Sequence, residues 1–371
     1  MIIGIDAYNI GSGGGINHLK NFLQHSIKEA CVKKIYVICK RDSLSKLPKD
    51  KLIFYKIFRF NYSTIISFAI QPLLHDSYFK KKKCNILFVP GGIYLGFFSP
   101  KVTMSQNFLP FDSNEIRRFV SSFSKIKFKL IKLLQLYTFN RSEGIIFLHE
   151  YPKQIISKSL KINKRSCVIP HGIKKQDYNY SNNKIKNLLY VSDINAYKHQ
   201  WVLAKAILEL AKENINLHLS LVGQLKNPYA EYLNNLKRDY LYFDKHITLV
   251  GEVNPYEVEA YLKNTDCFIY LSTCENLPIS LLESMSFGLP IITTNKKPMT
   301  SVVPIQNVFV DPTNMNSIKK GIKLMLSIKN LNKISKINKS ESLKYNWSES
   351  SSKTIDFFKE IISPNNQHSQ N

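Results

Sequence analysis

Short apolar, β-branched runs recur along the chain, separated by longer stretches that are compatible with helices. Near-continuous apolar strands that alternate with helices are typical of parallel sheets covered on both faces. The strands predicted in the first half are Ile2–Ala7, Ile35–Cys39, Leu52–Ile57, Ile86–Val89, Val102–Met104, Gly144–Leu148 and Cys167–Ile169. Those predicted in the second half are Leu188–Ser192, Leu217–Val222, Ile247–Val250, Cys267–Leu271, Pro290–Thr293 and Val308–Val310.

Helical periodicity fills most gaps of the second series, and two such series predict two doubly wound α/β domains. The polar stretch 176–186 lacks apolar periodicity, so we place the domains at 1–178 and 179–346. The last residues, 364–371, are polar and predict a disordered tail. Two domains of this kind are expected to face each other across a cleft at the carboxyl ends of their strands. The predicted helices of the second half are Trp201–Leu210, Tyr229–Leu236, Tyr256–Leu262 and Ile279–Phe287.

Two glutamates flank the start of one predicted helix. Glu275 follows the strand Cys267–Leu271, Pro278 is placed to open the helix, and Glu283 lies two turns into it. The amides at the helix start suit a phosphate, and a carboxylate accepts hydrogen bonds from vicinal hydroxyls of a ribose or hexose. Together these groups describe a nucleotide-sugar site better than an acid/base pair.

A glycine-rich turn stands at the corresponding place in the first half. Residues 11–15 read GSGGG and connect the first strand to an apolar-periodic segment. Because Ile16 occupies the position of the third glycine, the turn does not match the dinucleotide fingerprint G-x-G-x-x-G. It would still expose backbone N–H groups without side-chain bulk.

The E-x7-E pair, preceded by FIYLS and followed by SMSFGLPII, resembles the signature of the retaining GT-B glycosyltransferases of family 4, group 1. The resemblance implies that Glu283 holds the donor ribose and that Glu275 contacts the transferred sugar or its phosphate. Asn276 and Leu277, between them, are then expected at the donor. Two Rossmann-like domains facing across a cleft, with helix 347–363 crossing back to the first domain, follow from the same resemblance.

The segment after Tyr190 resembles the family's loop that supplies cations to the donor diphosphate. Lys198 matches the family lysine and is expected to act in catalysis with Glu275. The commoner pattern has an arginine earlier in this loop, where this chain has Ser192 and Asp193. We therefore expect Ser192 near the donor and one of the usual cations to be missing.

First-half motifs resemble a bacterial surface-polysaccharide subfamily, with FVPGG at 88–92 and QNFLPF at 106–111. By resemblance, Gly14 and Gly15 approach the donor. Asn107 stands where many relatives have a histidine and is expected on the acceptor side, either binding a sugar hydroxyl or capping a strand end. His18 is a second acceptor-side candidate that could face the cleft or the core. His171 occupies a turn near the interdomain hinge.

The chain carries 52 Lys and Arg against 27 Asp and Glu, a formal net charge of +25. Residues 116–137 predict one basic amphipathic helix, with an apolar face of Phe119, Phe123, Ile126, Leu130, Leu133 and Tyr137. This helix either packs that face on the core with a solvated basic side, or its basic side also meets anionic lipid headgroups. Lys80–Lys83 add a second basic cluster. Nucleic-acid binding is disfavoured because no recognition motif is present.

No D-x-D motif or metal-ligand spacing occurs, so neither a metal nor another cofactor is expected. The six cysteines are scattered, and the N-terminus has no signal-peptide pattern, which indicates a cytoplasmic protein that could be peripheral at the inner face of the plasma membrane.

These observations predict a retaining, metal-independent hexosyltransferase. It would move a hexose from a nucleotide diphosphate sugar to a lipid-linked or oligosaccharide acceptor in O-antigen, capsule or similar surface-polysaccharide synthesis. The alternatives are a GT-B-like sugar-nucleotide epimerase and a non-catalytic basic binding protein.

Overall fold

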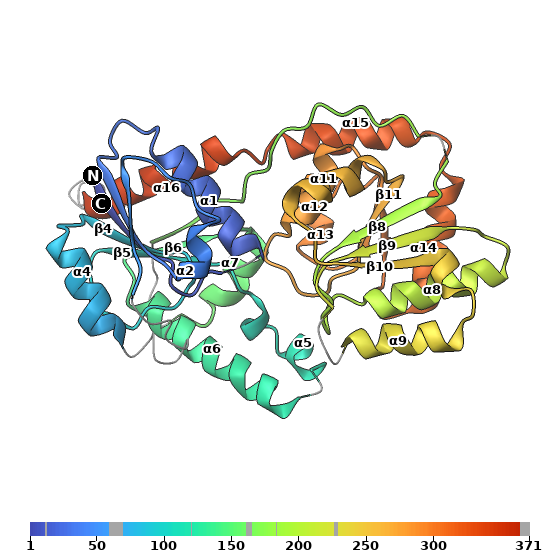
Figure 1. Ribbon diagram of the computed structural model, residues 1–371, viewed down its shortest axis with the longest axis horizontal. Helices are drawn as coiled ribbons and strands as arrows, with labels where there is room; N and C mark the ends of the chain where they lie inside the picture. The colour runs from blue at the N-terminus through green and yellow to red at the C-terminus, as the bar shows by residue number, and fades with distance from the viewer. Residues whose placement is uncertain are drawn as a thin grey trace, which may run out of the picture. The chain divides into compact units, whose positions relative to one another are not determined.

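A computed structural model describes residues 1–11, 13–58, 70–119, 121–160, 165–182, 184–225 and 229–363 (Figure 1). The predicted tail 364–371 lies outside the described residues. The chain forms two compact units. Unit 1 comprises 1–111, 125–172 and 345–371, and unit 2 comprises 112–124 and 173–344.

All the strand pairs are parallel, as the apolar runs predicted. The strands of unit 1 are β1 (Ile2–Asp6), β2 (Lys34–Ile38), β3 (Ile53–Lys56), β4 (Ile86–Val89), β5 (Lys101–Ser105), β6 (Gly144–Phe147) and β7 (Arg165–Val168). Those of unit 2 are β8 (Asn187–Val191), β9 (His218–Val222), β10 (Ile247–Gly251), β11 (Cys267–Tyr270), β12 (Ile291–Thr294) and β13 (Val308–Val310).

Helices connect these strands and cover the sheets (Figure 1). In unit 1 they are α1 (Gly13–Ser26), α2 (Arg41–Leu44), η1 (Gln71–His75), α4 (Asp76–Lys81), η2 (Leu109–Phe111), α6 (Ser122–Asn140, mostly in this unit), α7 (Glu150–Ser157) and α16 (Trp347–Ile362). In unit 2 they are α5 (Ser113–Arg117), α8 (Gln200–Lys212), α9 (Tyr229–Asp239), α10 (Phe243–His246), α11 (Pro255–Lys263), α12 (Ile279–Ser286), α13 (Met299–Val302), α14 (Met315–Ser327) and α15 (Leu331–Ser342).

The sheet of unit 1 has the order β3-β2-β1-β4-β5-β6-β7. The chain order reverses between β1 and β4, and such a switch point is where doubly wound sheets bind ligands, outside the carboxyl ends of the strands. The glycine-rich turn follows β1, and the segment Pro90–Gly92 follows β4. The glycine-rich turn and the Pro90–Gly92 segment therefore both lie at the carboxyl ends of adjacent strands.

The sheet of unit 2 has the order β10-β9-β8-β11-β12-β13, with its switch point between β8 and β11. β11 and β12 are buried along their whole length, which explains their continuous apolar sequence. The loop after β8 carries Lys198, and the loop after β11 carries Glu275. The strand order thus brings the two predicted catalytic residues to one edge.

The C-terminal helix α16 lies beside α1 in unit 1 (Figure 1). The ring of Phe358 lies 6.2 Å from that of Phe22 and 5.3 Å from that of Phe88. This aromatic contact joins the first and the last described helices of the chain in a single core.

The predicted basic helix 116–137 is in fact two helices, α5 and α6. Phe119, between them, is buried and contacts the rings of Tyr197 and Tyr229 in unit 2 at 6.5 Å and 6.1 Å. The other five residues of the predicted apolar face are exposed on α6, so this face does not pack on the core. No helix in the described part of the chain is long and apolar enough to span a bilayer.

Candidate functional site

The switch point of unit 2 is held together by a buried tyrosine. The Tyr190 hydroxyl, near the end of β8, donates to the carbonyl oxygen of Lys198 at 2.8 Å and accepts from the N–H of Leu271 at 3.2 Å. Burial and the nearby Glu275 carboxylate hold the pKa of Tyr190 well above its ordinary value, so the hydroxyl keeps its proton. One hydroxyl therefore fixes the lysine loop against the end of β11.

Lys198, Glu275 and Tyr270 form a closed group of three polar side chains. The Lys198 ammonium pairs with the Glu275 carboxylate and donates to the Tyr270 hydroxyl at 2.7 Å. Tyr270 in turn donates to Glu275 at 2.9 Å. The lysine and glutamate side chains are 10% and 14% exposed, so the pair is largely shielded from solvent but not fully enclosed. An ammonium has three N–H donors, and two are used here, which leaves one for a ligand.

A second set of contacts orders the turn that presents Lys198. His199 has a left-handed backbone with φ 55°, and its Nε2 lies 3.1 Å from the Thr273 hydroxyl. The N–H of Thr273 donates to the Tyr197 carbonyl at 2.9 Å. Burial, together with the positive charges of Arg118 and Lys296, lowers the pKa of His199 to about 3. The imidazole is therefore neutral at physiological pH and acts in the turn as a hydrogen-bonding group.

Glu283 lies on α12, the helix that follows the loop containing Glu275. Burial, with a smaller contribution from Glu259, raises the pKa of Glu283 from 4.5 to about 7. In the described part of the chain its carboxylate has no hydrogen-bond or ion-pair partner. Asn276 and Leu277 are buried in the loop that leads into α12. A carboxyl group of this kind is available to accept hydrogen bonds from a ligand.

Ser192 directly follows β8, and its polar groups bond to nearby backbone. Its N–H donates to the Val222 carbonyl at 2.8 Å, and its hydroxyl donates to the Asp193 carbonyl at 2.8 Å. Gly223 has φ 141°, and a Cβ there would lie 2.2 Å from the Ser192 carbonyl oxygen. Only glycine fits this close approach. Gly223, directly after β9, thus sets the path of the loop after β8.

The residues predicted in unit 1 lie at different depths. Gly14 is exposed and Gly15 half-buried at the start of α1. Asn107 is exposed, and its side-chain oxygen accepts from the N–H of Leu109 at 3.2 Å, so it closes a turn after β5. Of the two alternatives for Asn107, this contact gives it a capping role, and its amide nitrogen stays available to a ligand.

His18 faces the core of unit 1. It is 1% exposed, and its Nδ1 lies 3.1 Å from Nδ1 of His171. Both imidazoles contact the Trp347 ring, at 5.6 Å and 5.8 Å. Burial lowers the pKa of His18 to about 4 and holds that of His171 well below its usual range. The acceptor-side position expected of His18 is thus an interior position, beside the start of α16.

The sequence reasoning missed Tyr270 and Tyr190. Both are the last or next-to-last residues of strands, at Tyr270 in CFIY and Tyr190 in NLLYV. A tyrosine at the carboxyl end of an otherwise aliphatic buried strand was the available signal, because its hydroxyl must find a partner when buried. Their rings stack at 5.3 Å across the switch point.

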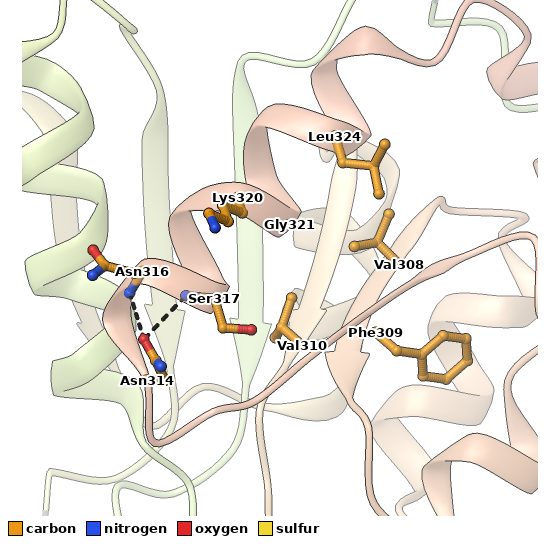
Figure 2. Close-up of a pocket in the computed structure, with 9 residues that line it drawn as sticks. All are labelled: Val308, Phe309, Val310, Asn314, Asn316, Ser317, Lys320, Gly321 and Leu324. Carbon is orange, nitrogen blue, oxygen red and sulfur yellow. Dashed lines mark hydrogen bonds between the residues drawn. The ribbon is translucent and has the colours of Figure 1, made fainter.

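A hollow elsewhere in unit 2 lies between β13 and α14 (Figure 2). Figure 2 shows Asn314 accepting from the N–H groups of Asn316 and Ser317, at 2.9 Å and 3.2 Å, as the cap of α14. None of the predicted site residues lines this hollow. Among the described residues, no group of three or more His, Cys, Asp or Glu side chains is arranged to hold a metal ion.

Comparison with known proteins places this geometry in context. Residues 174–342 match the family model described as "Glycosyl transferases group 1". The capsular polysaccharide biosynthesis glycosyltransferase CapH of Staphylococcus aureus is 26% identical over 227 residues, which cover 59% of this chain and 60% of CapH. The segment that matches the family model includes Lys198, Glu275 and Glu283.

A second relative is the UDP-Gal:alpha-D-GlcNAc-diphosphoundecaprenol alpha-1,3-galactosyltransferase of Escherichia coli, 26% identical over 197 residues, 47% of this chain and 49% of that protein. The matches thus span 60% of the length of CapH and 49% of that of the galactosyltransferase. In three dimensions it is similar to HepE of Anabaena, solved in complex with UDP and glucose, with a TM-score of 0.74 and 13% identity over 97% of this chain and all of that one.

Proposed function

Because residues 174–342 match the glycosyl transferases group 1 model and the chain has a two-sheet GT-B fold, we propose that this chain is a retaining glycosyltransferase that uses a nucleotide diphosphate sugar. The observation that carries the proposal is the group formed by Lys198, Tyr270 and Glu275 at the switch point of unit 2. It places a cation and a carboxylate where doubly wound sheets bind nucleotides.

Each predicted donor residue has a chemical task in this proposal. The free N–H of Lys198 meets the donor diphosphate, together with the N-terminal amides of α12. Glu275 accepts a hydrogen bond from a hydroxyl of the transferred hexose, and Glu283 accepts from the ribose hydroxyls. Lysine and helix amides supply the positive charge in this arrangement, so we propose that transfer needs no metal ion.

The transfer step breaks the bond between the anomeric carbon and the donor phosphate oxygen. The electron pair stays on that oxygen, and the nucleoside diphosphate leaves, stabilised by Lys198. The acceptor hydroxyl oxygen forms the new bond on the same face of the sugar, and its proton passes to the departing phosphate oxygen. The anomeric configuration is therefore retained.

The acceptor is proposed as a lipid-linked glycan for a surface polysaccharide. CapH is named for capsular polysaccharide biosynthesis, and the Escherichia coli relative for a diphosphoundecaprenol-linked acceptor. A hexose donor is supported by the UDP and glucose bound in the HepE structure, which has the same fold. Such an enzyme would work on the cytoplasmic side of the membrane.

The test is a panel of UDP-, GDP- and TDP-sugars with the purified chain, measured by calorimetric binding and by release of nucleoside diphosphate. One donor should bind, and Glu283→Ala should abolish its binding. Glu231→Ala is the matched control, since Glu231 is an exposed glutamate of unit 2 that pairs with the exposed Arg238. Wild-type affinity in Glu283→Ala would remove the ribose assignment.

Further measurements test metal independence, retention of the anomeric configuration and transfer as opposed to epimerisation. The proposal expects release to continue in EDTA and the product to keep the donor's anomeric configuration by NMR. Loss of release in EDTA would contradict metal independence. An epimerised sugar formed without any acceptor would replace the transferase by an epimerase.

A further inference from the structure

Helix α6 carries five large apolar side chains on the side that faces away from the protein. Phe123, Ile126, Leu130, Leu133 and Tyr137 are 76%, 65%, 51%, 65% and 40% exposed. They recur at steps of three and four residues, so they form one continuous strip on the helix, here called the α6 stripe. A helix on a water-exposed surface normally shows the reverse pattern.

The opposite side of α6 is anchored without help from the stripe. Thr138 accepts a hydrogen bond from the N–H of Tyr94 at 2.9 Å, and the Phe139 ring stacks on Phe111 at 6.4 Å. Gln135, Thr138 and Phe139 are the buried residues of the helix. Because folding does not use the stripe, its composition calls for another explanation.

The apolar surface continues past the end of α6. The Arg141 guanidinium lies 5.3 Å from the Tyr137 ring centre and 5.1 Å from that of Phe97, which is 58% exposed. The N–H of Phe97 donates to Asp76 at 2.6 Å, which ties this loop to the start of α4. From Ile126 to Tyr137 the stripe therefore belongs to a wider surface of unit 1, in which a cation bridges two exposed rings.

The charges beside the stripe all have one sign. The 19 residues of α6 include four lysines and no Asp or Glu. At about 100° per residue, Lys127 falls on one side of the stripe, and Lys125, Lys129 and Lys132 fall on the other. Lys132 lies over the Phe111 ring at 5.5 Å, whereas the other three have no acidic partner among the described residues.

We infer that the α6 stripe is a docking surface for an anionic lipid bilayer. The helix would lie in the plane of the interface, with its apolar side chains among the acyl chains and its lysines at the headgroups. Lysine stems lie along apolar surface while their ammonium groups stay in the polar layer. Protein interfaces are depleted of lysine, so the lysine border favours lipid over a second protein surface.

This inference does not rest on the proposed function, because it uses only residues of α6 and its neighbours. It also differs from the expectation drawn from the sequence, in which the basic side alone would touch lipid. Here the exposed apolar side chains supply the main contact, and the lysines select for negative charge.

The experiment is flotation of the full chain with vesicles of phosphatidylglycerol and phosphatidylcholine, and with vesicles of phosphatidylcholine alone. The stripe variant combines Ile126→Ser, Leu130→Ser and Leu133→Ser. The matched control combines Leu241→Ser, Ile305→Ser and Leu324→Ser, three apolar residues of unit 2 that are 102%, 84% and 57% exposed. The charge variant combines Lys125→Gln, Lys127→Gln and Lys129→Gln. Circular dichroism and thermal melts check that all variants fold.

We expect the wild type and the control variant to float with the anionic vesicles. The partition coefficient should fall at least about 100-fold in the stripe variant, and about 100-fold in the charge variant. Binding to phosphatidylcholine alone should be much weaker. Equal flotation of the stripe variant and the wild type, or no flotation of the wild type, would overturn the inference. A wild-type dimer in sedimentation that the stripe variant loses, without any flotation, would assign the surface to a second copy instead.

Discussion

At the switch point of unit 2 the two loops are joined by polar side chains, whereas at the switch point of unit 1 the corresponding turn is glycine. In unit 2, Lys198, Tyr270 and Glu275 bond one another across β8 and β11. In unit 1, a Cβ on Gly15 would lie 3.1 Å from the side-chain oxygen of Gln106. The same kind of topology thus carries hydrogen-bonded charged side chains at one switch point and a glycine turn without such side chains at the other.

The difference indicates which kind of ligand each sheet could hold. Side chains that are held before the ligand arrives need no reorganisation, so they suit a constant group such as a diphosphate. A glycine turn presents amides and space, which adapts to ligands of various shapes. We expect substitutions in the unit 2 group to affect the chemistry, and Glu283 of unit 2 and His18 of unit 1 to respond to pH in opposite directions.

The largest effect should come from breaking the unit 2 group at its cation. Lys198→Met removes the charge that would stabilise the leaving diphosphate, and kcat should fall by about 100- to 1000-fold. Release of nucleoside diphosphate at saturating donor measures this. Lys205→Met, an exposed lysine on α8, is the control and should keep wild-type kcat. An unchanged kcat in Lys198→Met would show that the diphosphate is held elsewhere.

The second effect is the pH dependence contributed by Glu283. Its pKa is about 7 when folded and 4.5 ordinarily, so the folded protein binds more protons between those values. The free energy of unfolding therefore falls as pH rises from about 4.5 to 7. Glu283→Gln removes this loss, and at pH 8 it should be more stable than wild type by about 3 kcal/mol. Urea unfolding at several pH values tests this, and a stability difference that does not change with pH would contradict it.

The third effect runs the other way and belongs to unit 1. The pKa of His18 is 6.5 ordinarily and about 4 when folded, so the unfolded chain binds more protons between those values. Stability should fall on acidification from pH 6.5 towards 4, by about 1.4 kcal/mol per pH unit for each such histidine. In His18→Phe the slope should be smaller, whatever its stability at pH 7. Thermal melts from pH 7 to 5 measure the slope, and an unchanged slope would locate the acid sensitivity elsewhere.

The smallest effect should follow from loosening the unit 2 group without discharging it. Tyr270→Phe removes the hydroxyl that bridges Lys198 and Glu275, at a cost of about 1 kcal/mol in the free energy of unfolding. Since the lysine then loses one of its two anchors, kcat should fall about tenfold while donor affinity changes less. Tyr190→Phe, which frees the Lys198 backbone instead, gives a matched comparison. Wild-type kcat in both variants would show that catalysis does not depend on the tyrosine hydroxyls that position Lys198 and Glu275.

The fold could be predicted from the sequence because its strands are buried on both faces. Runs such as Ile86–Val89 and Cys267–Tyr270 have little reason to be apolar throughout unless helices cover both sides of the sheet. The prediction of one helix over 116–137 was wrong, because the segment forms two helices. The prediction that its apolar face packs on the core was also wrong, because five of the six residues of that face are exposed. Periodicity shows that a helix has an apolar side, but it does not show whether that side meets a core or lies exposed.

The candidate site could be predicted only in part. Lys198, Glu275 and Glu283 were identified one by one from motifs, but their local partners depend on strand order and loop path, which a motif does not contain. Tyr270 entered the group because β11 lies beside β8 in the sheet. The burial of His18 depends on Trp347, which is far away in sequence and packs on the same face of α1. Long-range contacts of this kind need the folded chain.

The path of the backbone has a consequence for how the protein is made. The chain leaves unit 1 at Gly172, builds almost all of unit 2, and returns at Tyr345 to add α16. During synthesis, Phe22 and Phe88 therefore lack their contact with Phe358 until the C-terminal segment is made. His18 likewise lacks its contact with Trp347 until then. Unit 2 can complete its core while unit 1 still exposes aromatic surface, a state that invites aggregation or chaperone binding. A chain that ended shortly before residue 345 would contain almost all of unit 2 but lack α16 of unit 1.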